Sequence, residues 1–364
     1  MALPGDIIRK KEFQKLVEYK KTLFTEPDLH QLAIELTMSC NCRCLHCGSG
    51  CGEAHDPTAL SDEEILKALL DLKTDLKAEG KRAPFIFVTG GEPLLRPGAI
   101  RLMQEVYRMG YNWGMTTNGI LIDARTAGAL KEAHISSVGV SIDGLRETHD
   151  WFRQTPGAYD RTMDALHHLL EAGVKKVMVT TVVHRKNLDE LEQLYRIVRA
   201  SGCHSWRVIN MEPIGRALEH PELMLSGEDY RTLLDFIEKH NKKAFPVNFG
   251  CNHFLGFSRE HRLRPWYFFC QSGLQVMSIR TNGDITGCLD IKDDPRMIQG
   301  NIRRDRLYDV WQNRFSVYRR VKARGSRTCG NCEYLEECDG GGFHTWDIEN
   351  GEPVLCILEQ LGEL

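Results

Sequence analysis

The sequence predicts an α/β fold, a partial (β/α)6 barrel of the TIM type followed by a cysteine-rich C-terminal domain. Short apolar runs alternate with segments of helical period up to about residue 213, which is typical of parallel βα units. Beyond about residue 250 that periodicity weakens and cysteine and glycine become frequent, so this part needs inorganic clusters to fold. The six strand candidates are residues 32–38, 85–89, 113–117, 138–142, 177–183 and 206–211.

Helical segments lie between the strand candidates. The first begins with the capping box Ser61-Asp-Glu-Glu64, in which Glu64 can reach back to the Ser61 amide. The other helices are expected at residues 97–109, 123–133, 159–172, 188–201, 226–241 and 305–323. Six strands are fewer than the eight of a closed barrel, so an open barrel is expected. The expected organisation is an N-terminal extension at 1–30, the barrel at 31–213, a bridging segment at 214–250 and the C-terminal domain at 251–364.

Composition excludes several classes of protein. The 364 residues are 42% hydrophobic and 27% charged, which is ordinary for a globular protein. A net charge of −3 argues against a nucleic-acid-binding surface, and no apolar run approaches a membrane span. The N-terminus lacks the apolar core of a signal peptide, so a cytoplasmic location is expected. The 13 cysteines, concentrated at 40–51 and 270–356, indicate metal clusters rather than disulfides.

Three cysteines follow the first strand candidate on one short loop. Cys40, Cys44 and Cys47 form a Cys-x3-Cys-x2-Cys arrangement. A structural zinc site uses four protein ligands, whereas a [4Fe–4S] cluster held by three cysteines keeps one iron open to a ligand. Cys42 and Cys51 lie close by, so other pairings and a zinc site remain alternatives.

Polar motifs also follow the next strand candidates, and chemistry in such sheets gathers at the carboxyl ends of the strands. In Gly90-Gly91-Glu92-Pro93 the glycines permit close backbone approach, Pro93 stiffens the exit, and Glu92 can accept hydrogen bonds from an ammonium group. Asn118 follows the third strand. Ser141 and Asp143, at alternating positions, share one face of the fourth and suit ribose hydroxyls or a carboxylate.

Together these motifs resemble those of the radical S-adenosylmethionine (SAM) enzymes. The resemblance implies that the open iron chelates SAM and that the Gly-Gly-Glu-Pro segment receives its methionine amine. It further implies that Ser141 and Arg153 hold the ribose and the carboxylate, an Arg being suited to a carboxylate by its planar fork. His46 stands where the family commonly carries an aromatic residue and would stack on adenine, and Met211, after the sixth strand, would also touch adenine.

The C-terminal cysteines are similar to the SPASM domain of radical SAM enzymes. By that resemblance a complete auxiliary [4Fe–4S] cluster has four thiolate ligands, and a zinc ribbon is the alternative. These ligands are Cys329, Cys332, Cys338 and Cys356.

The first auxiliary site departs from the SPASM pattern. It would use Cys270 and Cys288, but position 342 is glycine where the pattern has cysteine. With Cys251 as a replacement, the site has at most three thiolates. It would then be a [4Fe–4S] cluster with an open or non-cysteine ligand such as His344 or Asp290, a [2Fe–2S] cluster, or absent.

The resemblance implies that an electron, from a flavodoxin- or ferredoxin-type donor, splits SAM into methionine and a 5′-deoxyadenosyl radical. The radical then removes hydrogen from a substrate carbon. SPASM relatives mostly modify peptides, so a ribosomally synthesised peptide or a protein side chain is the expected substrate, with a crosslink or oxidation as the result. Asp290 would accept a proton when the substrate radical is oxidised. Only about 30 residues precede the first strand, so a separate leader-binding protein is expected.

Three alternatives stay open. The chain could be an oxidase like the anaerobic sulfatase maturases, a radical SAM enzyme for a small molecule, or a non-catalytic iron–sulfur electron-transfer protein. The last of these does not need the Gly-Gly-Glu-Pro motif, Ser141 or Arg153 at strand ends.

Overall fold

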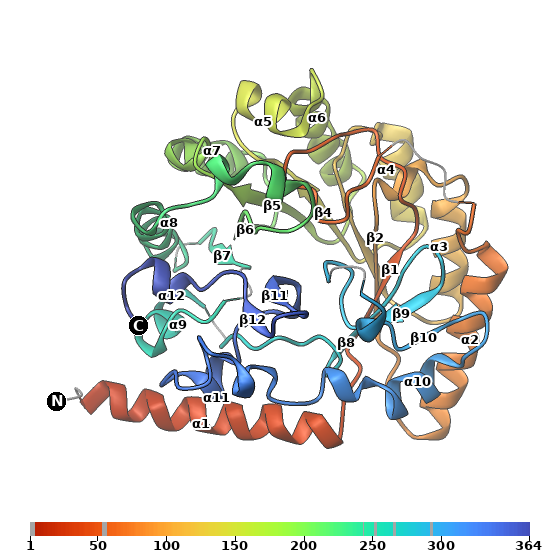
Figure 1. The fold of residues 1–364 in the computed structure, drawn as a ribbon. Coiled ribbons are helices and arrows are strands. Elements are labelled where there is room, and N and C mark those ends of the chain that lie inside the picture. Colours follow the sequence, from red (N-terminus) through yellow and green to blue (C-terminus); the bar gives the residue numbers. More distant parts are fainter. Residues whose placement is uncertain (1–3, 53–56, 243, 251–252, 265–266, 292–293) are drawn as a thin grey trace.

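The computed structural model describes residues 4–52, 57–242, 244–250, 253–264, 267–291 and 294–364 (Figure 1). Six parallel strands follow one another in chain order through the centre of one curved sheet. They are β1 (Gln31–Glu35), β2 (Phe85–Thr89), β3 (Trp113–Thr117), β4 (Ser137–Ser141), β5 (Val177–Val183) and β6 (Ser205–Asn210). The predicted partial barrel is therefore confirmed, and β1 ends earlier than expected because the chain turns into the cysteine loop.

The sheet continues beyond these six strands. β7 (Val247–Phe249) pairs parallel with β6, and β8 (Val276–Ile279) pairs parallel with β1 on the other side. β9 (Asp284–Thr286) and β10 (Gly300–Asn301) then extend the β8 edge in antiparallel fashion. The C-terminal part of the chain thus supplies strands to the barrel sheet itself.

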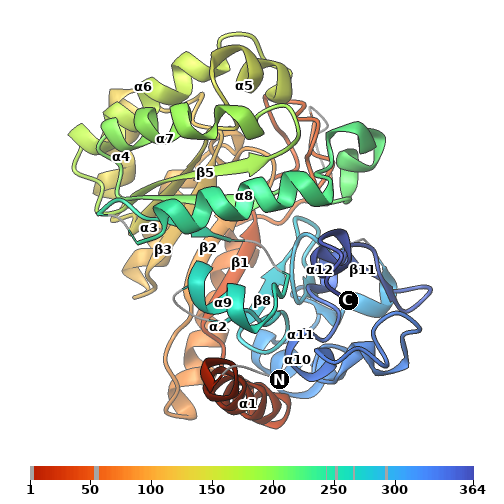
Figure 2. The ribbon, with the colours of Figure 1, turned by 90° about the vertical axis from the view of Figure 1, so that its left-hand side faces the viewer.

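Helices cover the outer face of the sheet (Figures 1 and 2). They are α2 (Asp62–Ala78), α3 (Ala99–Arg108), α4 (Ala124–Glu132), α5 (Arg146–Arg153), α6 (Ala158–Glu171), α7 (Leu191–Ala200) and α8 (Gly227–His240). The predicted capping box is present, because Glu64 N donates to Ser61 Oγ at 3.2 Å and Ser61 N to Glu64 Oε2 at 2.7 Å. Alternate strand residues such as Leu32, Ile34 and Val88 are fully or almost fully buried against these helices.

The N-terminal extension is a long helix that packs on the C-terminal region. α1 (Pro4–Thr25) runs along α9 (Phe257–Leu263) and α11 (Leu335–Cys338), at the bottom of Figure 1. Phe13 meets Phe254 edge to face, with ring centroids 5.6 Å apart. The buried Lys20 Nζ lies 3.2 Å from Asp339 Oδ2. This helix therefore braces the C-terminal region rather than the barrel helices.

The C-terminal region has little regular structure, as expected. Its remaining elements are α10 (Leu307–Asn313), β11 (Trp346–Asp347), β12 (Glu352–Pro353) and α12 (Ile357–Gln360). The single helix predicted at 305–323 is wrong in length, because a 3₁₀ turn follows α10. That turn buries both Phe315 and Tyr318, whose hydroxyl donates to Met297 O at 2.8 Å. No helix within the described ranges combines the length and hydropathy needed to cross a bilayer.

Candidate active site

The cysteine loop lies at the carboxyl end of β1 and is held from three sides. Cys40 N donates to Gly52 O at 2.7 Å, which closes the loop on itself. Leu45 N donates to the carbonyl oxygen of Phe152 in α5 at 3.0 Å. The Arg216 guanidinium donates to Cys44 O at 2.9 Å and to Cys51 O at 2.7 Å. Sequence analysis missed Arg216, because no motif marks a residue that binds backbone carbonyls.

Electrostatics divide the five cysteines of this loop into two groups. A hydrogen bond from the Cys42 thiol, aided by the Arg153 charge, lowers the pKa of Cys44 to about 7 although burial opposes it. The Cys42 thiol also lowers the pKa of Cys40. Since these bonds require Cys42 to keep its proton, they raise the pKa of Cys42.

The same relation holds at the other end of the loop. A hydrogen bond from Cys51 lowers the pKa of Cys47 to about 6, with the Arg216 charge adding to it, while burial opposes it. The pKa of Cys51 is correspondingly raised. Iron is bound by the thiolate form. The three cysteines chosen by spacing are therefore those that the fold favours as thiolates.

The Gly90-Gly91 pair lets the β2 loop lie directly against the β1 loop. Gly91 N donates to Thr37 O at 2.7 Å. A Cβ atom on Gly90 would lie 2.2 Å from Thr37 O, and one on Gly91 would lie 2.1 Å from Ser39 O. Gly90 also has φ of +135°, which side chains disfavour. Close backbone approach is thus the physical reason for both glycines.

Glu92 faces protein donors rather than the cavity. Its carboxylate accepts hydrogen bonds from Asn118 N at 2.8 Å, Thr117 Oγ1 at 2.9 Å and Leu94 N at 3.3 Å. Complete burial raises the pKa of Glu92 to about 7. Glu92 therefore joins the β2 and β3 loops, and the backbone of Gly90 and Gly91 is what reaches the cavity. Pro93 and Met211 also lie outside the cavity wall; Met211 packs against Phe152.

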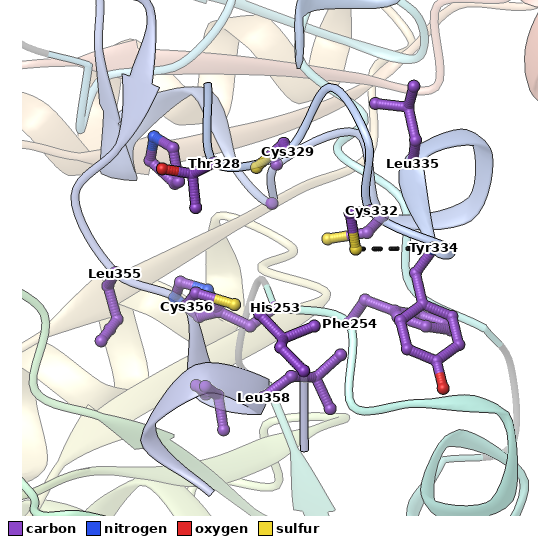
Figure 3. A pocket seen from close by; sticks show the side chains of 16 residues that line it. His253, Phe254, Thr328, Cys329, Cys332, Tyr334, Leu335, Leu355, Cys356 and Leu358 are labelled. Atoms are coloured by element: carbon purple, nitrogen blue, oxygen red, sulfur yellow. Dashed lines mark hydrogen bonds between the residues drawn. The ribbon is translucent and has the colours of Figure 1, made fainter. Parts of the chain in front are cut away.

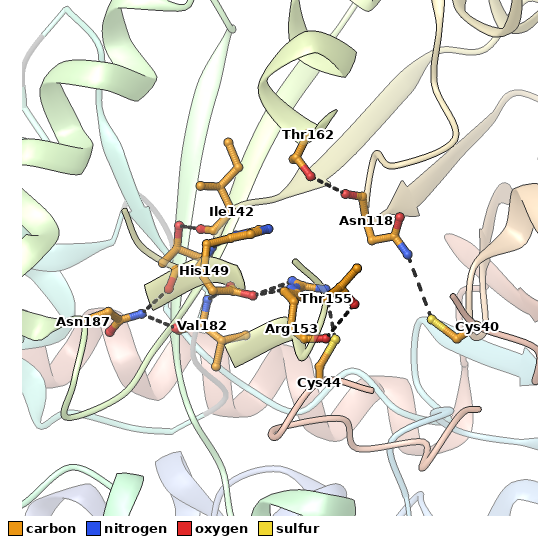
Figure 4. A network of polar contacts seen from close by, with 12 residues as sticks. Cys40, Cys44, Asn118, Ile142, His149, Arg153, Thr155, Thr162, Val182 and Asn187 are labelled. Atoms are coloured by element: carbon orange, nitrogen blue, oxygen red, sulfur yellow. Dashed lines mark hydrogen bonds and ion pairs between the residues drawn. The ribbon is translucent and has the colours of Figure 1, made fainter. Parts of the chain in front are cut away.

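Asp143 and Arg153 form a buried ion pair beside the cysteine loop, and Figure 4 shows Arg153 next to Cys44. Arg153 Nε and Nη2 lie 2.7 and 2.5 Å from Asp143 Oδ2, and Val182 N donates to Asp143 Oδ1 at 2.8 Å. Although burial would raise it, the Arg153 charge keeps the pKa of Asp143 below its usual value. Arg153 Nη1 lies 3.6 Å from Cys44 Sγ. Two nitrogens of the Arg153 guanidinium thus bind Asp143, and the third lies near the thiol of Cys44.

An aromatic stack forms the wall beside Cys47. His46 stacks on Phe152 with centroids 4.5 Å apart, and Phe152 stacks on His184 at 4.0 Å. Burial lowers the pKa of His46 to about 3, so its imidazole is neutral. His46 Nδ1 and Asn210 Oδ1 are buried and have no hydrogen-bond partner among the described residues. Two orphaned polar atoms beside a planar ring fit a nucleoside base.

These features surround one cavity of about 530 Å³, which is within the range of small-molecule sites. Side chains from both the barrel and the C-terminal region line it. The predicted residues that it brings together are Cys40, Cys44, His46, Cys47, Gly90, Gly91, Asn118, Ser141, Asp143, Arg153, Cys288 and Asp290. Because Cys288 and the cysteine loop share this cavity, the two halves of the chain form one site.

The first auxiliary site is only partly described. Burial, with the Asp290 charge adding to it, raises the pKa of Cys288, and the Cys270 thiol is near enough to contribute. Asp290 Oδ2 lies 3.9 Å from Cys288 Sγ, and the Asp290 side chain is exposed and lines the cavity. A Cβ on Gly48 would lie 3.7 Å from Asp290 Oδ1, so this carboxylate stands between the two cysteine groups. Cys251, the predicted replacement ligand, lies outside the described residues.

The cysteines of the second auxiliary set lie around one small cavity. Cys329, Cys332, Cys338 and Cys356 line a small cavity of about 30 Å³ beside α11 (Figure 3). Tyr334 N donates to Cys332 Sγ at 3.5 Å. Burial raises the pKa of Cys338 to about 12. A small hollow that brings four thiols together among apolar side chains, with a backbone donor, fits an iron–sulfur cluster.

Comparison with known families agrees with this geometry. Residues 34–198 match the radical SAM superfamily, and residues 270–333 match the SPASM iron–sulfur cluster-binding domain. The chain is a radical SAM enzyme with a SPASM domain. Its cofactors are SAM, the [4Fe–4S] cluster that binds SAM, and auxiliary iron–sulfur clusters.

Two groups of curated relatives are similar over most of the chain. The AdoMet-dependent heme synthase of Oleidesulfovibrio alaskensis is 28% identical over 92% of this chain and 88% of its own length. The mycofactocin maturase MftC of Mycolicibacterium smegmatis is also 28% identical, over 85% of this chain and 77% of its own.

Solved structures share the fold at low identity. Streptococcus suis SuiB bound to S-adenosylmethionine aligns with a TM-score of 0.68 and 19% identity, covering 86% of this chain and 73% of that one. The structure of anSMEcpe with bound AdoMet has a TM-score of 0.66 and 17% identity, covering 92% and 95%.

Proposed function

We propose that this enzyme modifies a side chain of a ribosomally synthesised peptide or of a protein, by forming a crosslink or by oxidation. The observation that carries the proposal is the shared cavity, which holds the Cys40–Cys47 loop and also Cys288 and Asp290 of the C-terminal region. The SAM-bound cluster supplies a 5′-deoxyadenosyl radical that removes a hydrogen atom from carbon.

The residues around the cavity divide this work. The cluster is held by Cys40, Cys44 and Cys47. Arg153 lies beside Cys44 and offsets the negative charge of the thiolate-bound cluster. The backbone of Gly90 and Gly91, with Asn118 and Ser141, binds the amino-acid and ribose parts of SAM. His46 and the free Asn210 Oδ1 receive adenine.

Cavity size supports a side chain as the reacting group. A volume of about 530 Å³ suits one small ligand, and SAM is itself such a ligand. The space that SAM leaves in this cavity then admits the reacting part of a larger substrate. Asp290, exposed in the cavity lining, accepts the proton when the substrate radical is oxidised. A separate leader-binding protein and a flavodoxin- or ferredoxin-type donor complete the proposed system, in the cytoplasm.

Structural neighbours add support from their own ligands. SuiB has been solved with its precursor peptide SuiA, at a TM-score of 0.68 to this chain. The enzyme anSMEcpe has been solved with the Cp18Cys peptide, at a TM-score of 0.67. Both identities are below 20%, so these structures support the fold's suitability for peptides and no particular peptide.

A second candidate substrate is a porphyrin. The relatives named AdoMet-dependent heme synthase and Fe-coproporphyrin III synthase, the latter from Methanosarcina barkeri, match 92% and 93% of this chain. Under this alternative the reacting group is a side group of the macrocycle, and the same cavity receives it.

Anaerobic reconstitution tests the function. With SAM and dithionite, the wild type should form 5′-deoxyadenosine, and Cys47→Ala should form none and bind about four fewer irons per chain. A substrate labelled with deuterium should transfer the label to 5′-deoxyadenosine. The proposal expects this transfer from a deuterated peptide, and the alternative expects it from a deuterated porphyrin. A reconstituted wild type that leaves SAM intact would contradict the proposal.

A further inference from the structure

Arg207 reaches into the cavity from the middle of β6. Side chains alternate along this strand, and Trp206 and Val208 pack into the core beneath the helices. Arg207 and Ile209 consequently face the interior of the barrel, where both line the cavity. The Arg207 side chain is exposed although protein surrounds it, because it extends into this cavity.

Arg207 differs from the other charged groups of the cavity. Arg153 is paired with Asp143, Arg216 binds two carbonyl oxygens, and Glu212 binds two histidines. Among the described residues, none forms a hydrogen bond or an ion pair with Arg207. The negative charge that acts on Arg207 is that of Asp290, which raises the pKa of Arg207 without forming a hydrogen bond or an ion pair with it.

No neighbouring group neutralises the charge of the Arg207 guanidinium. The protein around it lowers the pKa of Arg207, and the Asp290 charge opposes this shift only in part. Because the side chain is open to solvent within the cavity, the guanidinium is available to an anion that enters there.

The surroundings of Arg207 leave room for such an anion. A Cβ on Gly250 would lie 2.7 Å from Arg207 Cδ, so the glycine makes space for the arginine stem. Ile209 of the same strand lines the cavity beside it, and Ser278 of β8, whose buried Oγ has no partner within the described residues, lines another part of the same cavity.

The position of Arg207 separates it from the expected methionine end of SAM. Four strand steps separate β6 from β2, which is about 19 Å along the sheet at the usual strand spacing. Arg207 also precedes Asn210 by three residues, or about 10 Å along the strand, away from the edge that carries the cysteine loop. Within the proposed function the amino-acid end of SAM lies at Gly90 and Gly91 beside the cysteine loop, so the anion at Arg207 is a different group.

We propose that Arg207 binds a carboxylate of the substrate, which makes the substrate of this enzyme an acid. This inference rests on the proposed function, because it assigns the remaining part of the same cavity to the substrate. The planar guanidinium matches a carboxylate through two parallel hydrogen bonds. An Asp or Glu residue or a C-terminus of a peptide would supply this group, and so would the acidic side group of a porphyrin.

Binding to the reconstituted, SAM-loaded enzyme tests the assignment. One pair of probes is a capped heptapeptide with a single Glu and the same peptide with Gln. The other pair is a porphyrin with four propionate groups and its tetramethyl ester. The wild type should bind the acid of one pair more tightly than its neutral partner, by about tenfold to a hundredfold for a charge-assisted hydrogen bond.

The variants separate charge, geometry and general damage. Arg207→Gln should reduce the preference for the acid to less than about threefold, and Arg207→Lys should retain part of it because the charge remains without the fork. Arg199→Gln, at an exposed arginine of α7, is the matched control and should keep the wild-type preference. Iron content and thermal unfolding of each variant show whether the fold is intact.

The outcomes are distinct. The pair in which the acid is preferred identifies the source of the carboxylate. If the wild type shows no preference in either pair, or if Arg207→Gln keeps it, the assignment to Arg207 is wrong. Formation of 5′-deoxyadenosine by the wild type and by Arg199→Gln is measured separately, so its absence would overturn the proposed function while leaving the binding result interpretable.

Discussion

The carboxylate of Glu212 lies 2.5 Å from His344 Nε2, which joins the segment after β6 to the C-terminal region. Its other oxygen lies 3.0 Å from His253 Nε2. Although burial opposes it, the Glu212 charge raises the pKa of His344 to about 9. Burial would raise the pKa of Glu212, but the two histidines hold it far below its usual value. A buried ionic contact therefore connects the barrel to the SPASM region.

Glu212→Gln should weaken this connection. Breaking a buried charge pair destabilises a protein by about 3 kcal/mol. His344 has a folded pKa of about 9, above the ordinary value of 6.5, so its contribution is complete below pH 6.5 and is lost as pH rises through about 9. Denaturant unfolding at pH 6.5, 7.5 and 9 should show a decline in the wild type that Glu212→Gln lacks. Glu228→Gln, exposed on α8, should decline like the wild type.

Gly91→Ala should disrupt the cysteine loop. The new methyl group would lie 2.1 Å from Ser39 O, so the β1 and β2 loops must separate. We expect a lower melting temperature and less iron per chain after reconstitution. The matched control is Gly128→Ala in α4, where a Cβ meets nothing within 4 Å and should stabilise the helix by about 0.5–1 kcal/mol. Equal iron content in Gly91→Ala and Gly128→Ala would refute the role of this contact.

Cys356→Ala should remove the second auxiliary cluster. This residue lines the small cavity with Cys329, Cys332 and Cys338, and loss of one of four thiolates should lower iron by about four atoms per chain. Iron and sulfide analysis with visible absorbance measures the loss. Cys203→Ala is the control, because that thiol is buried in the barrel core and donates to Val198 O at 3.5 Å. If Cys356→Ala keeps both the iron content and the visible absorbance of the wild type, as Cys203→Ala should, then Cys356 is not a cluster ligand.

His149 should make the protein sensitive to acid. Burial, with the Arg153 charge adding to it, lowers the pKa of His149 to about 4. The unfolded chain takes up a proton near pH 6.5 and the folded chain does not, so the unfolding free energy should fall between pH 6.5 and 4. His149→Asn can still accept the hydrogen bond that Asp143 N donates to His149 Nδ1 at 3.0 Å.

The comparison is the slope of unfolding free energy against pH. His149→Asn should reduce the slope between pH 6.5 and 5 by up to one proton's worth, about 1.4 kcal/mol per pH unit. His167→Asn, at an exposed residue of α6, should keep the wild-type slope. If His149→Asn keeps the wild-type slope of unfolding free energy against pH, the acid sensitivity comes from other groups.

What the sequence could predict was governed by local signals. The central strands follow from apolar runs of five to seven residues, and the cysteine loop from its spacing. β7 and β8 have only three and four residues, too few for a periodic pattern. The strand count was therefore underestimated.

The direction in which a side chain points is the second feature that could not be predicted from the sequence. Glu92 belongs to a recognisable motif, yet it turns toward Thr117 and Asn118 and away from the cavity. Contacts distant in sequence could not be foreseen either, since Glu212 and His344 lie in different halves of the chain. Arg207 carries no motif and stands out only because the fold leaves it without a partner.

The pairing of β8 with β1 also has a consequence for how the protein is made. Gln31 finds its neighbour Val276 only after the intervening chain has been translated. At about 5–20 residues per second, this takes on the order of 12–50 seconds on the ribosome. Until then one edge of β1 is bare and open to pairing with another chain. The bonds that hold the cysteine loop come from residues up to Arg216, so a chain truncated before β8 should keep the loop but aggregate more readily than the full chain.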